Sequence, residues 1–268
     1  MISCNRAKRA LSAMPPLPTI ILTAFGSTRA ETQATFDRIE ADARRAFPDY
    51  PLRWAFTSST VRAALSKAGR EIFSPAETIR ILAEAGVKSA VIQSLHIMPG
   101  AEYADLLALP DRGLRRAIGR PLLADASDIA DVARIVGNLC APGKSVVVAA
   151  HGNANRPELN APLLALAAQI EAGRDNVALC AIEGPPGVEP MEKIRAAVQK
   201  SGTVLFIPLM LTAGVHVRDD LLGDAPDSWR NRLGARAAAV GPALGDLPEI
   251  RAIFLRHLAD ALRDDVLD

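Results

Sequence analysis

The chain has 268 residues, of which 49% are hydrophobic, and 31 basic side chains nearly balance 30 acidic ones. This length permits one large domain or two lobes with a substantial core, and the formal charge of +1 favours neither nucleic acid nor an anionic membrane as a partner. Cys4, Cys140 and Cys180 are odd in number and have no CxxC spacing, which argues against a disulfide framework and a structural zinc or iron–sulfur site.

Residues 1–18 are expected to form a flexible leader. They carry basic side chains between positions 6 and 9 and prolines at positions 15, 16 and 18, without the apolar stretch of a signal peptide. No segment approaches the roughly 20 uninterrupted apolar residues that cross a bilayer. We therefore expect a soluble, cytoplasmic protein.

Beyond the leader, apolar runs alternate with amphipathic segments. The predicted strands are residues 19–25, 52–56, 89–94, 145–150, 176–182 and 203–209. The predicted helices between and after them are residues 32–46, 75–85, 128–139, 162–172 and 190–200. Strict alternation of strand and helix is typical of βαβ units, so the chain is predicted to be an α/β protein with parallel sheets covered by helices.

The two halves of the chain resemble each other. Phe25-Gly26-Ser27 occupies the place in the first half that His151-Gly152-Asn153 occupies in the second, and two further strand ends recur in the same order. We expect two similar lobes, each a three-layer sandwich, with a crossover near residues 114–124. The expected divisions are a leader (1–18), an N-terminal lobe (19–125), a C-terminal lobe (126–246) and a terminal helix that packs back on the first lobe (247–268).

Three metal-competent residues follow predicted strands of the second half: His151, Glu183 and His216. In an open α/β fold the carboxyl ends of parallel strands face the ligand crevice, so these side chains are expected to meet there. Imidazole and carboxylate ligands together suit divalent cobalt, nickel, iron or zinc. The sequence thus indicates a metal-handling site.

Each of these residues also has a purely structural interpretation. His151 could donate to a backbone carbonyl or cap the next helix, and Glu183 could be an ordinary solvated loop acid. His216 could stand at a helix N-terminus marked by Asp219 and Asp220, or those carboxylates could orient its ring. The placement after strands favours the functional interpretation of His151 and, to a smaller degree, that of Glu183.

The first half offers weaker candidates. His96 ends a strand as His151 does and could line the same crevice, bind a second ligand or tie its loop down, whereas His257 fits a surface or packing role. Arg29 could pair with substrate carboxylates through bidentate hydrogen bonds. No GxxxxGK[ST] or GxGxxG pattern is present, so no nucleotide is expected, and the absence of GxSxG disfavours a serine hydrolase.

Several motifs in a linked order resemble the sirohydrochlorin cobaltochelatases of anaerobic cobalamin biosynthesis, which are class II chelatases. The motifs are Ala-Phe-Gly-Ser (24–27), Trp-Ala-Phe-Thr (54–57), Gln-Ser-Leu-His-Ile (93–97), Pro-Gly-Ala-Glu-Tyr (99–103), Ala-His-Gly (150–152), Ile-Glu-Gly (182–184), Pro-Leu-Met-Leu (208–211), Ala-Gly-Val-His (213–216) and Asp-Ser-Trp (227–229). The resemblance covers residues 18 to 262.

The resemblance implies two α/β lobes with a tetrapyrrole cleft between them and ATP-independent insertion of Co²⁺ into sirohydrochlorin. It implies that His151, Glu183 and His216 bind the metal and take part in catalysis. The expected substrate-binding residues are Phe25, Gly26, Ser27, Arg29, His96, Glu102, Gly152 and Asn153. A homo-oligomer is also compatible with the family. Some relatives, notably exported ones, bind haem through the histidine matching His96; haem is the less favoured alternative here, because residues 1–18 do not resemble a signal peptide.

The chain departs from its relatives at two positions near the expected metal site. Asn155 replaces a histidine and Val215 replaces an acid that relatives often carry, and the segment after Asn155 lacks aromatic residues for stacking on a macrocycle. These departures leave open a chelatase for iron or nickel, or a carrier that holds a metal or tetrapyrrole without catalysing insertion.

Overall fold

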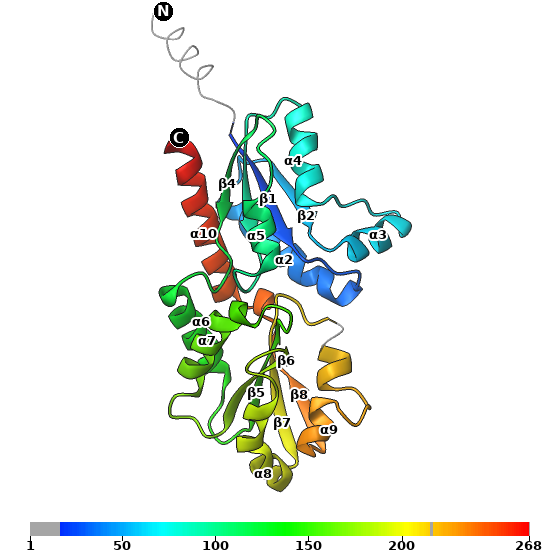
Figure 1. The fold of residues 1–268 in the computed structure, drawn as a ribbon, viewed down its shortest axis with the longest axis vertical. Coiled ribbons are helices and arrows are strands. Elements are labelled where there is room, and N and C mark those ends of the chain that lie inside the picture. Colours follow the sequence, from blue (N-terminus) through cyan, green and yellow to red (C-terminus); the bar gives the residue numbers. More distant parts are fainter. Residues whose placement is uncertain (1–16, 215–216, 268) are drawn as a thin grey trace, which may run out of the picture.

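The structure, a computed structural model, describes residues 17–214 and 217–267, which form two lobes stacked along the long axis of the molecule (Figure 1). The first lobe contains β1 (Thr19–Ala24), α2 (Ala30–Ala46), β2 (Leu52–Phe56), α3 (Ser59–Lys67), α4 (Pro75–Glu84), β3 (Ser89–Ser94), α5 (Ala101–Leu107) and β4 (Arg115–Gly119). The second contains α6 (Ala126–Leu139), β5 (Val146–Gly152), α7 (Ala161–Glu171), β6 (Val177–Glu183), α8 (Glu192–Ser201), β7 (Thr203–Leu209), α9 (Trp229–Leu233) and β8 (Ala237–Val240). Short helical turns and α10 (Pro248–Leu267) complete the fold.

Both sheets are parallel and have the same strand order. The first sheet runs β2-β1-β3-β4 and the second β6-β5-β7-β8, so β1 corresponds to β5 and β3 to β7. This repetition confirms the predicted α/β class with two similar lobes. In each lobe the central strand is flanked by the two strands that follow it in the chain, which brings three carboxyl strand ends side by side.

Helices cover both faces of each sheet because alternate strand residues point to opposite sides. In β1, Ile20 belongs to one buried cluster and Ile21 to another, which also contains Ile79 of α4. In β5, Val146 and Val147 divide in the same way. The cluster that contains Ile20 also contains Val146, so one continuous core joins the inner faces of the two lobes.

Two strands were not predicted from the sequence, and both are edge strands. β4 (Arg-Arg-Ala-Ile-Gly) lies within the expected crossover and pairs with β3, so the first sheet ends at Gly119. β8 (Ala-Ala-Ala-Val) is rich in a good helix former and pairs only with β7. Edge strands are half solvated and lack a long apolar run, so their pairing depends on a neighbour far away in sequence. The short helices α3, α5 and α9 were missed as well.

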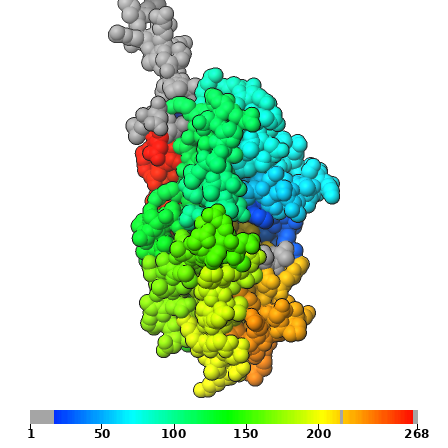
Figure 2. All heavy atoms as spheres, in the orientation of Figure 1, coloured from blue at the N-terminus to red at the C-terminus, as the bar shows by residue number. Residues whose placement is uncertain are grey.

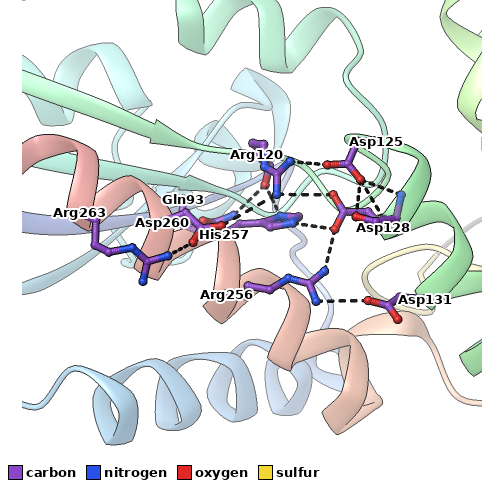
Figure 3. A network of polar contacts seen from close by, with 10 residues as sticks. Gln93, Arg120, Asp125, Asp128, Asp131, Arg256, His257, Asp260 and Arg263 are labelled. Atoms are coloured by element: carbon purple, nitrogen blue, oxygen red, sulfur yellow. Dashed lines mark hydrogen bonds and ion pairs between the residues drawn. The ribbon is translucent and has the colours of Figure 1, made fainter.

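The C-terminal helix α10 packs along the first lobe and is tied to α6 of the second by a buried polar network (Figure 3). His257 is 1% exposed, and its Nε2 lies 3.0 Å from Oδ1 of the fully buried Asp128. The other ring nitrogen, Nδ1, lies 3.1 Å from the carbonyl oxygen of Arg120. Arg256 Nη2 donates to the same Asp128 oxygen at 2.8 Å. His257 is therefore a buried packing residue that fastens α10 to the start of α6.

The helix ends follow local signals in the sequence. Ser74 and Glu77 form a reciprocal capping box at the start of α4, where Pro75 takes the first helical position. The Asp125 side chain accepts hydrogen bonds from two backbone N–H groups at the start of α6. The hydrogen bond from the Asp128 N–H, followed by those from the Ser127 hydroxyl and Arg120, holds the pKa of Asp125 well below its usual range. Within the described part of the chain, no helix is long and apolar enough to cross a membrane.

Candidate metal site at the strand ends

His151 and Glu183 lie at the carboxyl ends of the adjacent strands β5 and β6. In the register of β5 and β6, Gly152 is paired with Glu183, and His151 is the residue immediately before Gly152. Both side chains are exposed, although the strands that carry them are buried up to Ala150 and Ala181. The apolar strands thus deliver two metal-competent groups to solvent at the same edge of the sheet.

Two glycines allow the ends of β5 and β6 to approach this closely. Gly152 has φ +77°, and a Cβ atom added there would lie 2.0 Å from the carbonyl oxygen of Glu183. Gly184 has φ +68°, and a Cβ atom there would lie 2.4 Å from the carbonyl oxygen of Asn153. Residues with a side chain rarely adopt such φ values and would not fit here. The close approach of the two strand ends therefore explains why a glycine follows His151 and another follows Glu183.

The His151 ring is oriented by its own loop. Its Nδ1 lies 3.0 Å from the carbonyl oxygen of Gly152, which can only accept a hydrogen bond. In the neutral ring the proton consequently sits on Nδ1, and Nε2 carries the lone pair. This is the tautomer in which a histidine presents Nε2 to a metal ion.

Further hydrogen bonds hold the two loops. After Glu183 the chain folds back on β6, since the Gly187 N–H donates to Gly184 O and the Ala181 N–H donates to Gly187 O, each at 2.8 Å. Beside it, the buried Asn160 donates through Nδ2 to the Asn153 carbonyl at 3.0 Å. Asn160 was not among the predicted site residues. Its position before an apolar helix was the available signal.

The third expected ligand, His216, and its neighbour Val215 lie outside the described residues. The strand that leads toward them is described: Leu209 of β7 is paired with Ala150, so β7 ends beside the end of β5. Among the residues that the structure does describe, no group of three histidine, cysteine, aspartate or glutamate side chains is gathered closely enough to hold a metal ion. Of the three expected ligands, His151 and Glu183 are the two that lie among the described residues.

In the first lobe, the candidates after β1 form a compact turn. Phe25 is 55% exposed, although it directly follows a fully buried strand. Gly26 has φ +96°, and a Cβ atom there would lie 2.5 Å from Cδ2 of Phe56. Ser27 Oγ accepts from the backbone N–H of Arg29 at 3.3 Å, and Arg29 is the N-cap residue of α2. This turn presents an aromatic face and a guanidinium group at the strand end.

His96 and Glu102 follow β3. His96 Nδ1 lies 2.9 Å from Ser94 Oγ, while its Nε2 is buried without a hydrogen-bond partner in the described structure. Burial lowers the pKa of His96, against the opposing charge of Glu102, so the ring is neutral at pH 7. The hydrogen bond within the loop agrees with an anchoring role for His96, and the second ring nitrogen is left unsatisfied by the described residues.

The carboxyl ends of the two sheets approach each other across the boundary between the lobes. The pKa of Arg218 is raised mainly by its hydrogen bond with Asp219, and also by the charge of Glu31 in the first turn of α2. Figure 2 shows the blue segment that includes α2 recessed between the cyan part of the first lobe and the orange part of the second. A cavity of about 450 Å³ lies elsewhere, beside the start of β4, and contains none of the candidate residues.

Comparison with known proteins gives a consistent result. The model of the family described as cobalt chelatase (CbiK) matches residues 18–263. The chain is 32% identical over 258 residues to the sirohydrochlorin cobaltochelatase CbiKC of Nitratidesulfovibrio vulgaris, covering 91% of this chain and 90% of the relative. It is 29% identical over 255 residues to the sirohydrochlorin cobaltochelatase of Salmonella typhimurium, covering 91% and 96%.

Among solved structures, SirB from Bacillus subtilis with Fe³⁺ has a TM-score of 0.62 at 13% identity, covering 92% of this chain and 96% of that one. The sirohydrochlorin chelatase SirB from Bacillus subtilis subspecies spizizenii, in complex with cobalt, has a TM-score of 0.59 at 13% identity and the same coverage. At such low identity these structures establish the fold. Together with the family match over nearly the whole chain, they confirm the resemblance seen in the motifs: the chain belongs to the cobalt chelatase family.

Proposed function

We propose that the protein inserts Co²⁺ into sirohydrochlorin without a nucleotide, as a step of cobalamin biosynthesis, and that the ion is bound at the ends of β5 and β6. The observation that carries this proposal is the position of His151 and Glu183 at the carboxyl ends of the paired strands β5 and β6, with the two glycines that let these strand ends approach each other. The names of the two curated relatives support cobalt as the metal and sirohydrochlorin as the macrocycle.

Co²⁺ is a substrate here and leaves with the product. His151 would ligate it through Nε2, Glu183 through a carboxylate oxygen, and His216, whose position is not described, would be the third ligand. Imidazole nitrogen and carboxylate oxygen ligands suit cobalt, but they also suit nickel and iron. The choice of metal therefore comes from the relatives rather than from the ligand types.

Insertion exchanges one divalent cation for two pyrrole protons. The ion leaves its protein ligands one after another as it gains four macrocycle nitrogens, while the two N–H bonds of the macrocycle break. Glu183 is placed to accept a proton once the metal departs, because a carboxylate released from a cation regains its basicity. His151, already oriented by Gly152, can accept the other at Nε2. Both protons then pass to solvent, since both side chains are exposed.

The macrocycle would lie between the two lobes. Phe25 offers its exposed ring to the face of the tetrapyrrole, and Arg29 offers a guanidinium to a peripheral carboxylate. The backbone of Gly26, Ser27, Gly152 and Asn153 would line the two strand ends. His96 and Glu102 would contact the macrocycle from the end of β3.

The test is anaerobic turnover, followed by the absorbance of sirohydrochlorin, with Co²⁺, Fe²⁺ and Ni²⁺ supplied separately. Wild-type protein should give multiple turnovers with Co²⁺ fastest, and His151→Ala and Glu183→Gln should each abolish them. Glu189→Gln, which changes another exposed carboxylate shortly after Glu183, is the matched control and should remain active. A spectral shift on binding without acceleration over the protein-free rate would refute the enzyme and favour a carrier.

A further inference from the structure

A short turn ahead of α10 touches the end of β7. This turn, η4 (Leu244–Asp246), is a 3-10 helix, and its backbone is hydrogen-bonded to the two residues that follow β7. The Leu244 N–H donates to Met210 O and the Gly245 N–H donates to Leu211 O, both at 2.9 Å. The chain that leaves the second sheet beside β5 is therefore fixed to η4 at its first two residues.

The same turn is hydrogen-bonded to α2 of the first lobe. One carboxylate oxygen of Asp246, Oδ1, accepts from Thr35 Oγ1 at 2.7 Å and from Arg38 Nη1 at 2.8 Å. Thr35 is 4% exposed, so its hydroxyl has little access to water. A Cβ atom added at Gly245 would lie 2.5 Å from Thr35 Cγ2 and 2.6 Å from Leu211 O. At this point α2, η4 and the end of β7 are in direct contact.

A third element holds the turn from behind. Arg251 of α10 donates through Nη1 to the carbonyl oxygens of Gly245, at 3.2 Å, and Asp246, at 2.9 Å. Its Nε donates to Asp42 Oδ2 of α2 at 2.6 Å. The Asp246 backbone is thus fixed independently of its side chain, so the carboxylate approaches α2 from a rigid base.

We propose that Asp246 is a positioning residue for cobalt insertion and that its contacts set the spacing between the start of α2 and the end of β7. This inference rests on the proposed function. Glu31 lies one helical turn before Thr35, and Arg29 precedes it as the N-cap of α2. On the other side, Met210 and Leu211 continue β7 beside the end of β5. The Asp246 carboxylate therefore joins the two sides between which the macrocycle is proposed to bind.

Loss of this carboxylate should act mainly on the rate of insertion, because Asp246 is not among the residues proposed to contact the metal or the macrocycle. Misplacement of reacting groups by about 1 Å can cost on the order of 100-fold in rate. We therefore expect kcat of Asp246→Ala to fall by about 10- to 100-fold, with KM for sirohydrochlorin changed by less than about threefold. Asp246→Asn retains an acceptor for Thr35 and should recover most of the lost kcat.

The control is Asp131→Ala. Asp131 also links two elements, since its Oδ2 lies 3.2 Å from Arg256 Nη1 of α10, and its side chain is 35% exposed against 30% for Asp246. It lies on α6, outside the strand ends. Thr35→Val removes the partner hydroxyl with little change in shape, so it tests the same contact should Asp246→Ala fail to fold. The unfolding temperature and amide hydrogen exchange of residues 30–38 and 210–214 are measured beside the kinetics.

The expected result is a reduced kcat and faster exchange in both segments for Asp246→Ala and Thr35→Val, with near wild-type values for Asp131→Ala and a substantial rescue in Asp246→Asn. Active wild-type protein with an unchanged kcat in folded Asp246→Ala and Thr35→Val would overturn the positioning role alone. No turnover by the wild-type protein would overturn the proposed function and this role with it.

Discussion

Replacement of Gly152 by alanine is the sharpest structural test of the site, because it probes the approach of β5 to β6. The left-handed backbone at φ +77° costs a residue with a side chain about 1–2 kcal/mol. In addition, the new Cβ would lie 2.0 Å from the Glu183 carbonyl oxygen, and overpacking of this kind costs about 1–3 kcal/mol. We expect the free energy of unfolding to fall by about 2–5 kcal/mol and the unfolding temperature by about 5–15 °C.

The clash also separates the two side chains that are proposed to hold the metal. Pushing Glu183 away from His151 should weaken Co²⁺ binding by about 10-fold or more. The matched control is Gly143→Ala, since Gly143 has φ +75° but no atom within 4 Å of the added Cβ. It should lose only the backbone contribution of about 1–2 kcal/mol and keep its cobalt affinity.

Thermal unfolding and isothermal titration with Co²⁺ separate the two effects. Equal stability and equal cobalt affinity in Gly152→Ala and Gly143→Ala would refute the close approach of the strand ends. Reduced stability with unchanged cobalt affinity in Gly152→Ala would agree with the steric clash. It would contradict the idea that the close approach of the strand ends supports metal binding.

Three other substitutions test separate parts of the account. Burial raises the pKa of Asp42, but the hydrogen bond and charge of Arg251 outweigh this, so the net shift is downward. The stabilisation from this pair is therefore complete above the unfolded value near 3.8 and declines as pH falls through the lower folded value, so chemical denaturation should show that the deficit of Asp42→Asn shrinks on acidification. His257→Leu strips the buried Asp128 of one partner and should cost about 3 kcal/mol in denaturant unfolding, whereas a neutral result would mean that the pair does not anchor α10. Phe25→Ala should change stability by less than about 0.5 kcal/mol because the ring is exposed, yet raise KM for sirohydrochlorin about 3- to 10-fold, and an unchanged KM would exclude stacking.

The fold was largely predictable where the sequence carries its own pattern. Buried central strands such as β1 and β5 are continuous apolar runs, and their alternation with amphipathic helices fixed the α/β class. β4 and β8 were not predictable in this way, since two arginines open one and three alanines the other. Their strand conformation depends on hydrogen bonds to β3 and β7, which are tertiary contacts.

The residues of the candidate site were likewise predictable only where the sequence carries a local pattern. His151 and Glu183 stood out because each ends an apolar strand before a glycine, and the register then placed them on neighbouring strands. The role of Asp246 could not be inferred, because its partner Thr35 lies in a separate element far away in the sequence. Asn160 carried only the signal of a polar residue before an apolar helix, and the structure was needed to identify Asn153 as its partner. Short polar motifs outside strand ends leave no period in the sequence.

The most direct test of the central claim is the ligand-field absorption of Co²⁺ bound to the protein without macrocycle, recorded for wild type, His151→Ala, Glu183→Gln and Glu189→Gln. The account predicts one bound Co²⁺ with a spectrum typical of nitrogen and oxygen ligands in wild type and Glu189→Gln, and loss or a clear shift of that spectrum in the other two. Identical spectra and affinities in all four proteins would contradict a cobalt site at the ends of β5 and β6.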